Sequence, residues 1–143
     1  MDFTVHEKEH NIVVIDCPER LDLNQSEELK KIFAEEIDKN KYRFIINLTR
    51  TTYVDSSGLG AIVSHIAKSR SNGGDIRLAL TFGLILKLLE VTNLNKILKT
   101  YDDVDTAISS YWDFTKKCKN VKVFSIERFL NIEYLQKYVI SVR

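Results

Sequence analysis

The residues best suited to chemistry lie in one short stretch, residues 54–60, which reads Val-Asp-Ser-Ser-Gly-Leu-Gly. An apolar run at residues 44–48 precedes it and a segment with helical periodicity follows, which indicates a strand-to-helix junction. The first N–H groups of a helix lack partners within the helix and together carry about half a positive charge. A hydroxyl of Ser56 or Ser57 at this position could therefore hold or receive a phosphate.

The same stretch also has a purely structural interpretation. Asp55 with Ser56 or Ser57 can cap a helix, and Gly58 fits a tight turn. On residue chemistry alone, this capping role is the more common one. The stretch is neither a P-loop nor a dinucleotide-binding turn, because it lacks both the Gly-Lys-Ser/Thr ending and a third glycine.

Other reactive residues form no pattern typical of a catalytic or metal site. No His-x3-His pattern on a helix and no Cys pair accompanies His6, His10 or His65, and Cys17 and Cys118 are far apart. On one continuous helix, Ser57 and His65 would be separated by a rise of about 12 Å, which is too far for a base to activate a nucleophile. We therefore expect no enzyme activity, cofactor or metal.

The bulk composition is that of an ordinary globular protein. The 143 residues suit one domain, with 44% hydrophobic and 29% charged residues. A net charge of +1 argues against direct nucleic-acid binding. The chain shows no apolar run of transmembrane length and no signal peptide, and its two cysteines suit a reducing compartment, so we expect a cytoplasmic protein.

Alternating strand and helix patterns predict an α/β fold with a largely parallel sheet. An N-terminal hairpin with a turn at residues 9–11 is followed by a helix from Asn24 or Ser26 to about Lys39. A second helix should run from Leu59 to the glycine break at residues 72–74. Strands are expected at residues 3–9, 12–17, 44–48, 75–80 and 97–101, and two further helices at about residues 84–91 and 102–112.

The last part of the chain is less clearly patterned. We place a domain at residues 1–114 and a C-terminal extension at 115–143. The extension has a strand-like stretch at residues 121–124 and an amphipathic helical pattern from Ser125. It could pack on the domain, contact a partner or be foreign sequence.

The order of elements, together with four separated motifs, resembles the STAS domain family, and within it the bacterial anti-sigma factor antagonists. The motifs are Arg20-Leu21-Asp22 after the second strand, the hydroxyl turn with the Asn47-Leu48 strand end before it, the glycine break at residues 72–74, and the leucine-rich stretch at residues 88–94. The resemblance covers about residues 3–113. It implies a STAS fold with a four- to five-stranded, mostly parallel sheet, an N-terminal hairpin and about four helices, plus the extension.

The resemblance also implies a function. In this family the second hydroxyl residue of the turn, here Ser57, is phosphorylated, and the Asp22 position helps in recognising the partner. The partner would be an anti-sigma factor with serine kinase activity, and a PP2C-type phosphatase would reverse the modification. The partner-binding residues are then Asp22, Asp55, Ser56, Gly58 and Leu59.

The chain departs from the family pattern in two places. The glycine usual before the leucine-aspartate pair is replaced around Glu19-Arg20, and the proline common at the start of the third helix is Gly83. Two alternatives to the phosphorylation switch remain. One is a non-switching STAS subunit of a larger assembly, such as a lipid transporter or sensory complex. The other, a small hydrolase, would need a base near Ser57.

Overall fold

A five-stranded sheet forms the centre of the computed structural model, which describes residues 3–81 and 83–112. The strand order is β1-β2-β4-β6-β7, with β1 antiparallel to β2 and every other pair parallel. The predicted mostly parallel sheet with an N-terminal hairpin is therefore confirmed. The strands are β1 (Thr4–Lys8), β2 (Ile12–Asp16), β4 (Arg43–Leu48), β6 (Asp75–Leu80) and β7 (Lys99–Tyr101).

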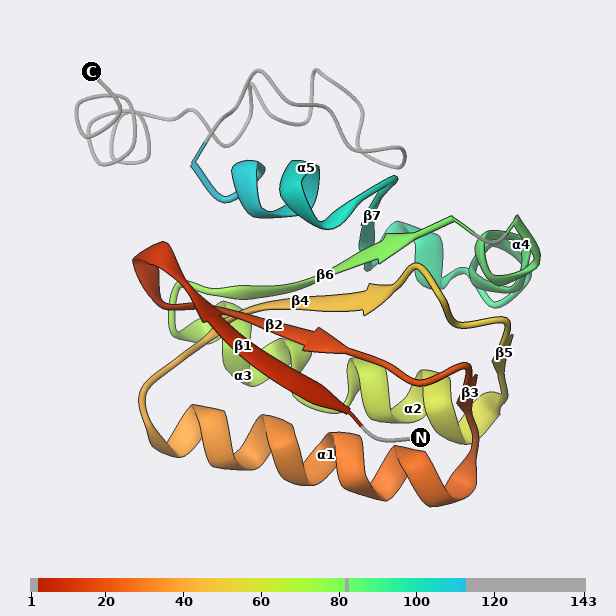
Figure 1. Cartoon of the computed structure of the whole chain (residues 1–143), viewed down its shortest axis with the longest axis horizontal. Helices are drawn as coiled ribbons and strands as arrows, with labels where there is room; N and C mark the ends of the chain where they lie inside the picture. The colour runs from red at the N-terminus through yellow and green to blue at the C-terminus, as the bar shows by residue number, and fades with distance from the viewer. Residues whose placement is uncertain (1–2, 82, 113–143) are drawn as a thin grey trace.

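Helices cover both faces of this sheet (Figure 1). On one face lie α1 (Leu23–Asp38), α2 (Ser56–Val63) and α3 (Ile66–Ser71), and on the other lies α5 (Val104–Ser109). The short α4 (Gly83–Val91) lies at the end of the sheet where the parallel strands finish, and a single 3-10 turn, η2 (Leu94–Lys96), leads from it to β7. In the part of the chain that the structure describes, no helix is both long and apolar enough to cross a bilayer.

Neighbouring residues of the central strands point into two separate cores. Phe44 and Ile46 pack with Phe33 of α1 in the larger cluster, whereas Ile45 packs with Ala107 of α5 in the smaller one. All five side chains are fully buried. This explains why residues 44–48 are almost uniformly apolar, as expected of a parallel strand covered on both faces.

Three features differ from the sequence predictions. A small second sheet joins β3 (Arg20–Leu21) to β5 (Tyr53–Val54), and two-residue strands are too short to show periodicity. Helix α1 begins at Leu23, because Asp22 caps it in place of Asn24 or Ser26. The predicted second helix is divided into α2 and α3 at Ser64, whose hydroxyl donates to the Ala61 carbonyl, a bond that tends to bend helices.

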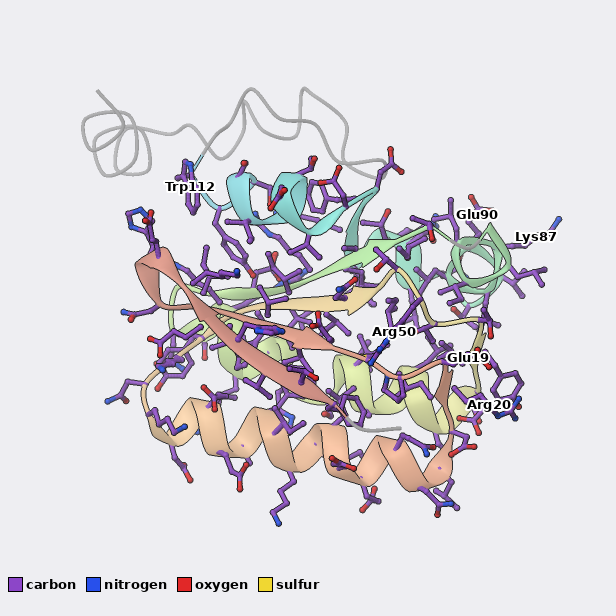
Figure 2. All side chains as sticks on the ribbon, viewed as in Figure 1. Glu19, Arg20, Arg50, Lys87, Glu90 and Trp112 are labelled. Atoms are coloured by element: carbon purple, nitrogen blue, oxygen red, sulfur yellow. The ribbon has the colours of Figure 1, made fainter. Side chains whose placement is uncertain are left out.

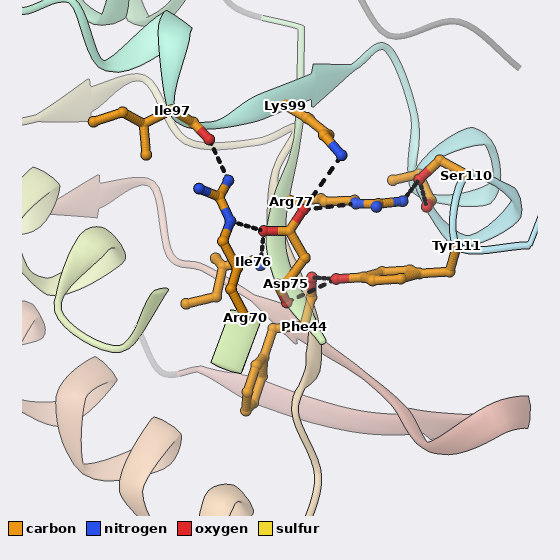
Figure 3. Close-up of polar contacts among 10 residues, drawn as sticks. Phe44, Arg70, Asp75, Ile76, Arg77, Ile97, Lys99, Ser110 and Tyr111 are labelled. Atoms are coloured by element: carbon orange, nitrogen blue, oxygen red, sulfur yellow. Dashed lines mark hydrogen bonds and ion pairs between the residues drawn. The ribbon is translucent and has the colours of Figure 1, made fainter. Parts of the chain in front are cut away.

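At the end of the sheet where the parallel strands begin, the buried carboxylate of Asp75 joins several elements (Figure 3). Asp75, 4% exposed, accepts hydrogen bonds from Arg70 at 2.8 Å and Arg77 at 3.1 Å, and Lys99 lies 3.8 Å away. Arg77 also stacks on the ring of Tyr111, whose hydroxyl lies 2.8 Å from the carbonyl oxygens of Phe44 and Asp75. This cluster ties α3, β6, β7 and the segment after α5 together.

The predicted extension at residues 115–143 lies outside the described residues, so the domain boundary at residue 114 stays a prediction.

Candidate functional site

Two aspartates are brought side by side by the small second sheet. In the parallel pair β3–β5, Leu21 lies opposite Val54, so the next residues, Asp22 and Asp55, leave the sheet together. The backbone N–H of Asp55 donates to the Leu21 carbonyl at 3.3 Å. Each aspartate is the N-cap of the helix that follows, and the sequence therefore starts two helices at one edge of the fold.

Both carboxylates are engaged by their own helices. The Asp55 carboxylate accepts from the N–H of Gly58 at 2.9 Å, and that of Asp22 accepts from the N–H of Asn24 at 3.2 Å. The side chain of Gln25 accepts in turn from the N–H of Asp22, which completes a capping box. The carboxylates therefore fix the starts of α1 and α2 and do not form an acid-base pair.

The two serines occupy the first turn of α2. Ser56 is exposed and Ser57 is half-buried. Within the described residues, neither hydroxyl makes a hydrogen bond, whereas the hydroxyls of Ser26, Ser64 and Ser110 all donate to nearby backbone carbonyls. The Ser57 oxygen is therefore held at a helix N-terminus without being sealed in the core or used for capping.

Gly58 and Leu59 lie inside the domain. A Cβ on Gly58 would come 2.4 Å from the Leu21 carbonyl oxygen, so only glycine lets α2 pack this closely against β3. Leu59 is 6% exposed and belongs to the larger core. That these two residues contact a partner stays a prediction, and in the structure both are buried where α2 packs on β3 and on the larger core.

The segments that lead into β3 and β5 are hydrogen-bonded to each other. The Thr51 hydroxyl, fully buried, donates to the Pro18 carbonyl at 2.8 Å, and Arg50 Nε donates to the Cys17 carbonyl at 2.9 Å. The Cys17 side chain is itself buried, and burial raises the pKa of its thiol far above the ordinary value. Cys17 is therefore a core residue and not a nucleophile.

Sequence reasoning missed one exposed pair at this site. The guanidinium of Arg20, on β3, lies 4.1 Å from the centre of the Tyr53 ring on β5. Figure 2 shows Arg20 and Glu19 at the same end of the molecule as Lys87 and Glu90 of α4, with Trp112 at the opposite end. The replacement of the family glycine around Glu19-Arg20 was the available signal, but it could not reveal the pairing of β3 with β5.

Large apolar side chains are exposed on the elements around the two aspartates. Leu23 begins α1, Tyr53 lies on β5, and Leu84 and Val91 lie on α4; their exposed fractions are 63%, 41%, 67% and 72%. The start of α1, β5 and α4 share one end of the molecule, beyond the carboxyl ends of the parallel strands (Figure 1). An apolar surface around an accessible hydroxyl suits the binding of another protein.

The histidines lie in separate places. His6 contacts Asp16 at 2.7 Å, and the His10 ring lies 5.0 Å from that of Trp112. His65 bonds to its neighbour Ser64 and packs on Phe33, and burial together with Lys30 and Lys68 lowers its pKa. In residues 3–81 and 83–112, no group of three or more His, Cys, Asp or Glu side chains could hold a metal ion.

Comparison with known proteins gives a consistent result. The model of the STAS domain matches residues 4–107. A protein of Thermotoga neapolitana, named a candidate anti-sigma factor antagonist, is 27% identical over 99 residues, which span 68% of this chain and 88% of the relative.

Solved structures share the fold. The crystal structure of the corresponding Thermotoga maritima protein superposes with a TM-score of 0.69 at 25% identity, over 76% of this chain and 93% of that one. SpoIIAA of Bacillus, in its phosphorylated form, gives a TM-score of 0.62 at 20% identity, over 76% and 98% of the two chains. At this identity the likeness to SpoIIAA shows the fold alone.

Proposed function

Because the chain belongs to the STAS domain family, we propose that it is an anti-sigma factor antagonist whose affinity for its partner is switched by phosphorylation of Ser57. Proteins of this kind regulate by binding and have no enzymatic activity. The relatives from Thermotoga are named for this role, and SpoIIAA is an anti-sigma factor antagonist solved both with and without its phosphate.

One observation carries the proposal: within the described residues the Ser57 hydroxyl makes no hydrogen bond, and the residue is half-buried in the first turn of α2. The free N–H groups of that turn favour a phosphate, which brings about −1.5 to −2 charges at neutral pH. Asp22 and Asp55 follow paired residues of the small second sheet and cap α1 and α2, so phosphorylation of Ser57 would concentrate negative charge at the starts of these two helices.

The negative charge of a phosphate on Ser57 would weaken the binding of the partner. Exposed Leu23, Tyr53 and Leu84 provide the apolar area that a partner would cover when Ser57 is unmodified. A phosphate on Ser57 would have to lose water on docking or face like charge from the partner, and either effect weakens the complex. Unmodified antagonist therefore binds the anti-sigma factor and releases the sigma factor, and phosphorylated antagonist does not.

The anti-sigma factor we propose is also a serine kinase. In the transfer, the Ser57 oxygen bonds to the γ-phosphorus of ATP, the bond from that phosphorus to the β,γ-bridging oxygen breaks, ADP leaves, and the hydroxyl proton passes to a base of the kinase. A PP2C-type phosphatase would reverse the modification by hydrolysis. These steps belong in the cytoplasm, where ATP and the transcription machinery meet.

The test is phosphorylation with purified components. The full chain is incubated with ATP and a purified serine-kinase anti-sigma factor from its own organism, and the product is mapped by mass spectrometry. We expect one phosphate on Ser57 and none on the matched S57A variant. No phosphate with any such kinase of the organism, or a phosphate placed elsewhere, would contradict the proposal.

A second function remains open, in which the same surface is a permanent interface in a larger assembly. The exposed Leu84 and Val91 on α4 favour it, because they would suit a constitutive contact. The intact mass of the protein purified from its own cells separates the two functions, since only the switch predicts a phosphorylated fraction.

A further inference from the structure

Arg20 occupies the outer side of the small second sheet, next to the two capping aspartates. In the β3–β5 register it lies opposite Tyr53, and its guanidinium stacks on that ring at 4.1 Å. The Arg20 side chain is 59% exposed. The pair therefore lies on the surface that the proposed function assigns to the partner.

The Arg20 guanidinium makes no hydrogen bond within the described part of the chain. Its Nε lies 3.9 Å from the Asp22 carboxylate, which is an ion pair at a distance too long for a hydrogen bond. The other described arginines differ, because each donates to a carbonyl, carboxylate or hydroxyl oxygen: Arg43, Arg50, Arg70 and Arg77.

Stacking on Tyr53 orients the Arg20 guanidinium so that it can bind a ligand. Contact with the Tyr53 ring restricts the guanidinium plane, so less rotamer freedom is lost when a planar anion binds. Because Nε is the atom nearest to Asp22, the terminal Nη atoms lie farther from that carboxylate. They offer two parallel donors, which match the two oxygens of a carboxylate.

The surroundings of the pair suit a protein ligand. Leu23 and Tyr53 are both exposed beside Arg20 and can be covered when a partner docks. Tyrosine and arginine surrounded by apolar area are the residue types that dominate binding energy at protein interfaces. A single cation between Glu19 and Asp22, in a chain of net charge +1, does not provide the basic surface that nucleic acid needs.

We propose that Arg20, stacked on Tyr53, is a specificity-determining residue that binds an aspartate or glutamate side chain of the anti-sigma factor. This inference rests on the proposed function and adds the chemistry of the contact. Arg20 then selects among partners by whether they present a carboxylate opposite β3.

The test compares variants of Arg20 in the unphosphorylated full chain. Each serine-kinase anti-sigma factor of the source organism is purified and immobilised, and affinities are measured by surface plasmon resonance. For the cognate one we expect R20A to bind at least about tenfold more weakly than the wild type, and R20K to lose severalfold because lysine keeps the charge but not the fork. K68Q, which removes an exposed charge from α3, is the matched control and should stay within about twofold.

A charge-reversal scan identifies the proposed carboxylate. R20E should bind weakly, and replacing one surface acid of the partner by lysine should restore its binding while weakening that of the wild type. If the wild type binds an anti-sigma factor but R20A binds equally well, or no acid couples to Arg20, the inference is wrong and the proposed function stands. If the wild type binds none of them, both are wrong.

Discussion

The carbonyl oxygen of Leu21 packs so closely against Gly58 that an ideal Cβ at position 58 would lie only 2.4 Å from it. No residue other than glycine therefore fits there unless the backbone shifts. This contact sets the distance between β3 and α2. Since Asp22 follows Leu21 and Ser57 precedes Gly58, it also sets the distance between the capping aspartate and the candidate phosphoacceptor. The geometry of the site thus depends on a backbone contact and not on a bond between functional side chains.

Substitution of the two glycines of α2 should have opposite effects. G58A forces Cβ against backbone and should lower the free energy of unfolding by about 1–3 kcal/mol. G60A meets nothing within 4 Å in the same helix and should raise it by about 0.5–1 kcal/mol. Urea unfolding of both variants checks this, and equal stabilities would show that β3 and α2 are not in such close contact.

Removal of the Asp55 cap should loosen the helix that carries Ser57. D55A deprives the Gly58 N–H of its acceptor and should cost about 1 kcal/mol, with faster hydrogen exchange at that amide. D55N retains an acceptor and should restore most of the stability. D38A, at the exposed C-terminal end of α1, serves as the control and should be nearly neutral. Unchanged exchange at Gly58 in D55A would contradict this assignment of the cap.

Loss of the buried charge at Asp75 should be the most destabilising of these changes. D75N leaves Arg70, Arg77 and Lys99 without their shared carboxylate, and breaking a buried ion pair in this way typically costs about 3–5 kcal/mol. Thermal and urea unfolding of the variant provide the measurement. A loss below about 1 kcal/mol would mean that the cluster contributes little to joining β6 to α3 and β7.

The same carboxylate should make stability depend on acid pH. Burial on its own would raise the pKa of Asp75, but Arg77, Lys99 and Arg70 together outweigh it and lower the pKa below the ordinary value of 3.8. The unfolded chain therefore takes up the proton first, so the contribution of Asp75 is complete above about pH 4 to 5 and is lost as the pH falls through the lower folded value. We expect the stability difference between wild type and D75N to be constant near neutral pH and to shrink below about pH 4. A difference that does not change with pH would contradict this.

The sequence predicted the long, periodic elements well and the short ones poorly. Runs of mainly apolar residues identified β4 and β6, because most positions of a strand that is covered on both faces are apolar. It could not identify β3 and β5, since two residues carry no period and their pairing joins positions 33 apart in the chain. The cap of α1 was placed two to four residues late, because Asp22 competed with Asn24 and Ser26, which are also good caps.

The features of the candidate site also divide into those that local sequence signals predict and those that depend on contacts between distant segments. Ser57 and Asp55 could be placed at a helix start from local signals alone, since capping is a property of adjacent residues. The closeness of Asp22 to Asp55 and the stacking of Arg20 on Tyr53 depend on how β3 meets β5, which no local pattern encodes. The buried position of Leu59 likewise follows from the packing of α2 on the sheet.

The affinity of the cognate anti-sigma factor for Ser57 variants tests the central claim most directly. Isothermal titration should give S57A and the unmodified wild type affinities within about threefold of each other, and S57D an affinity at least about tenfold weaker, because a negative charge at this position opposes docking. S71D, which adds the same charge at the end of α3, should bind like the wild type. Equal affinities for S57A and S57D would contradict the account.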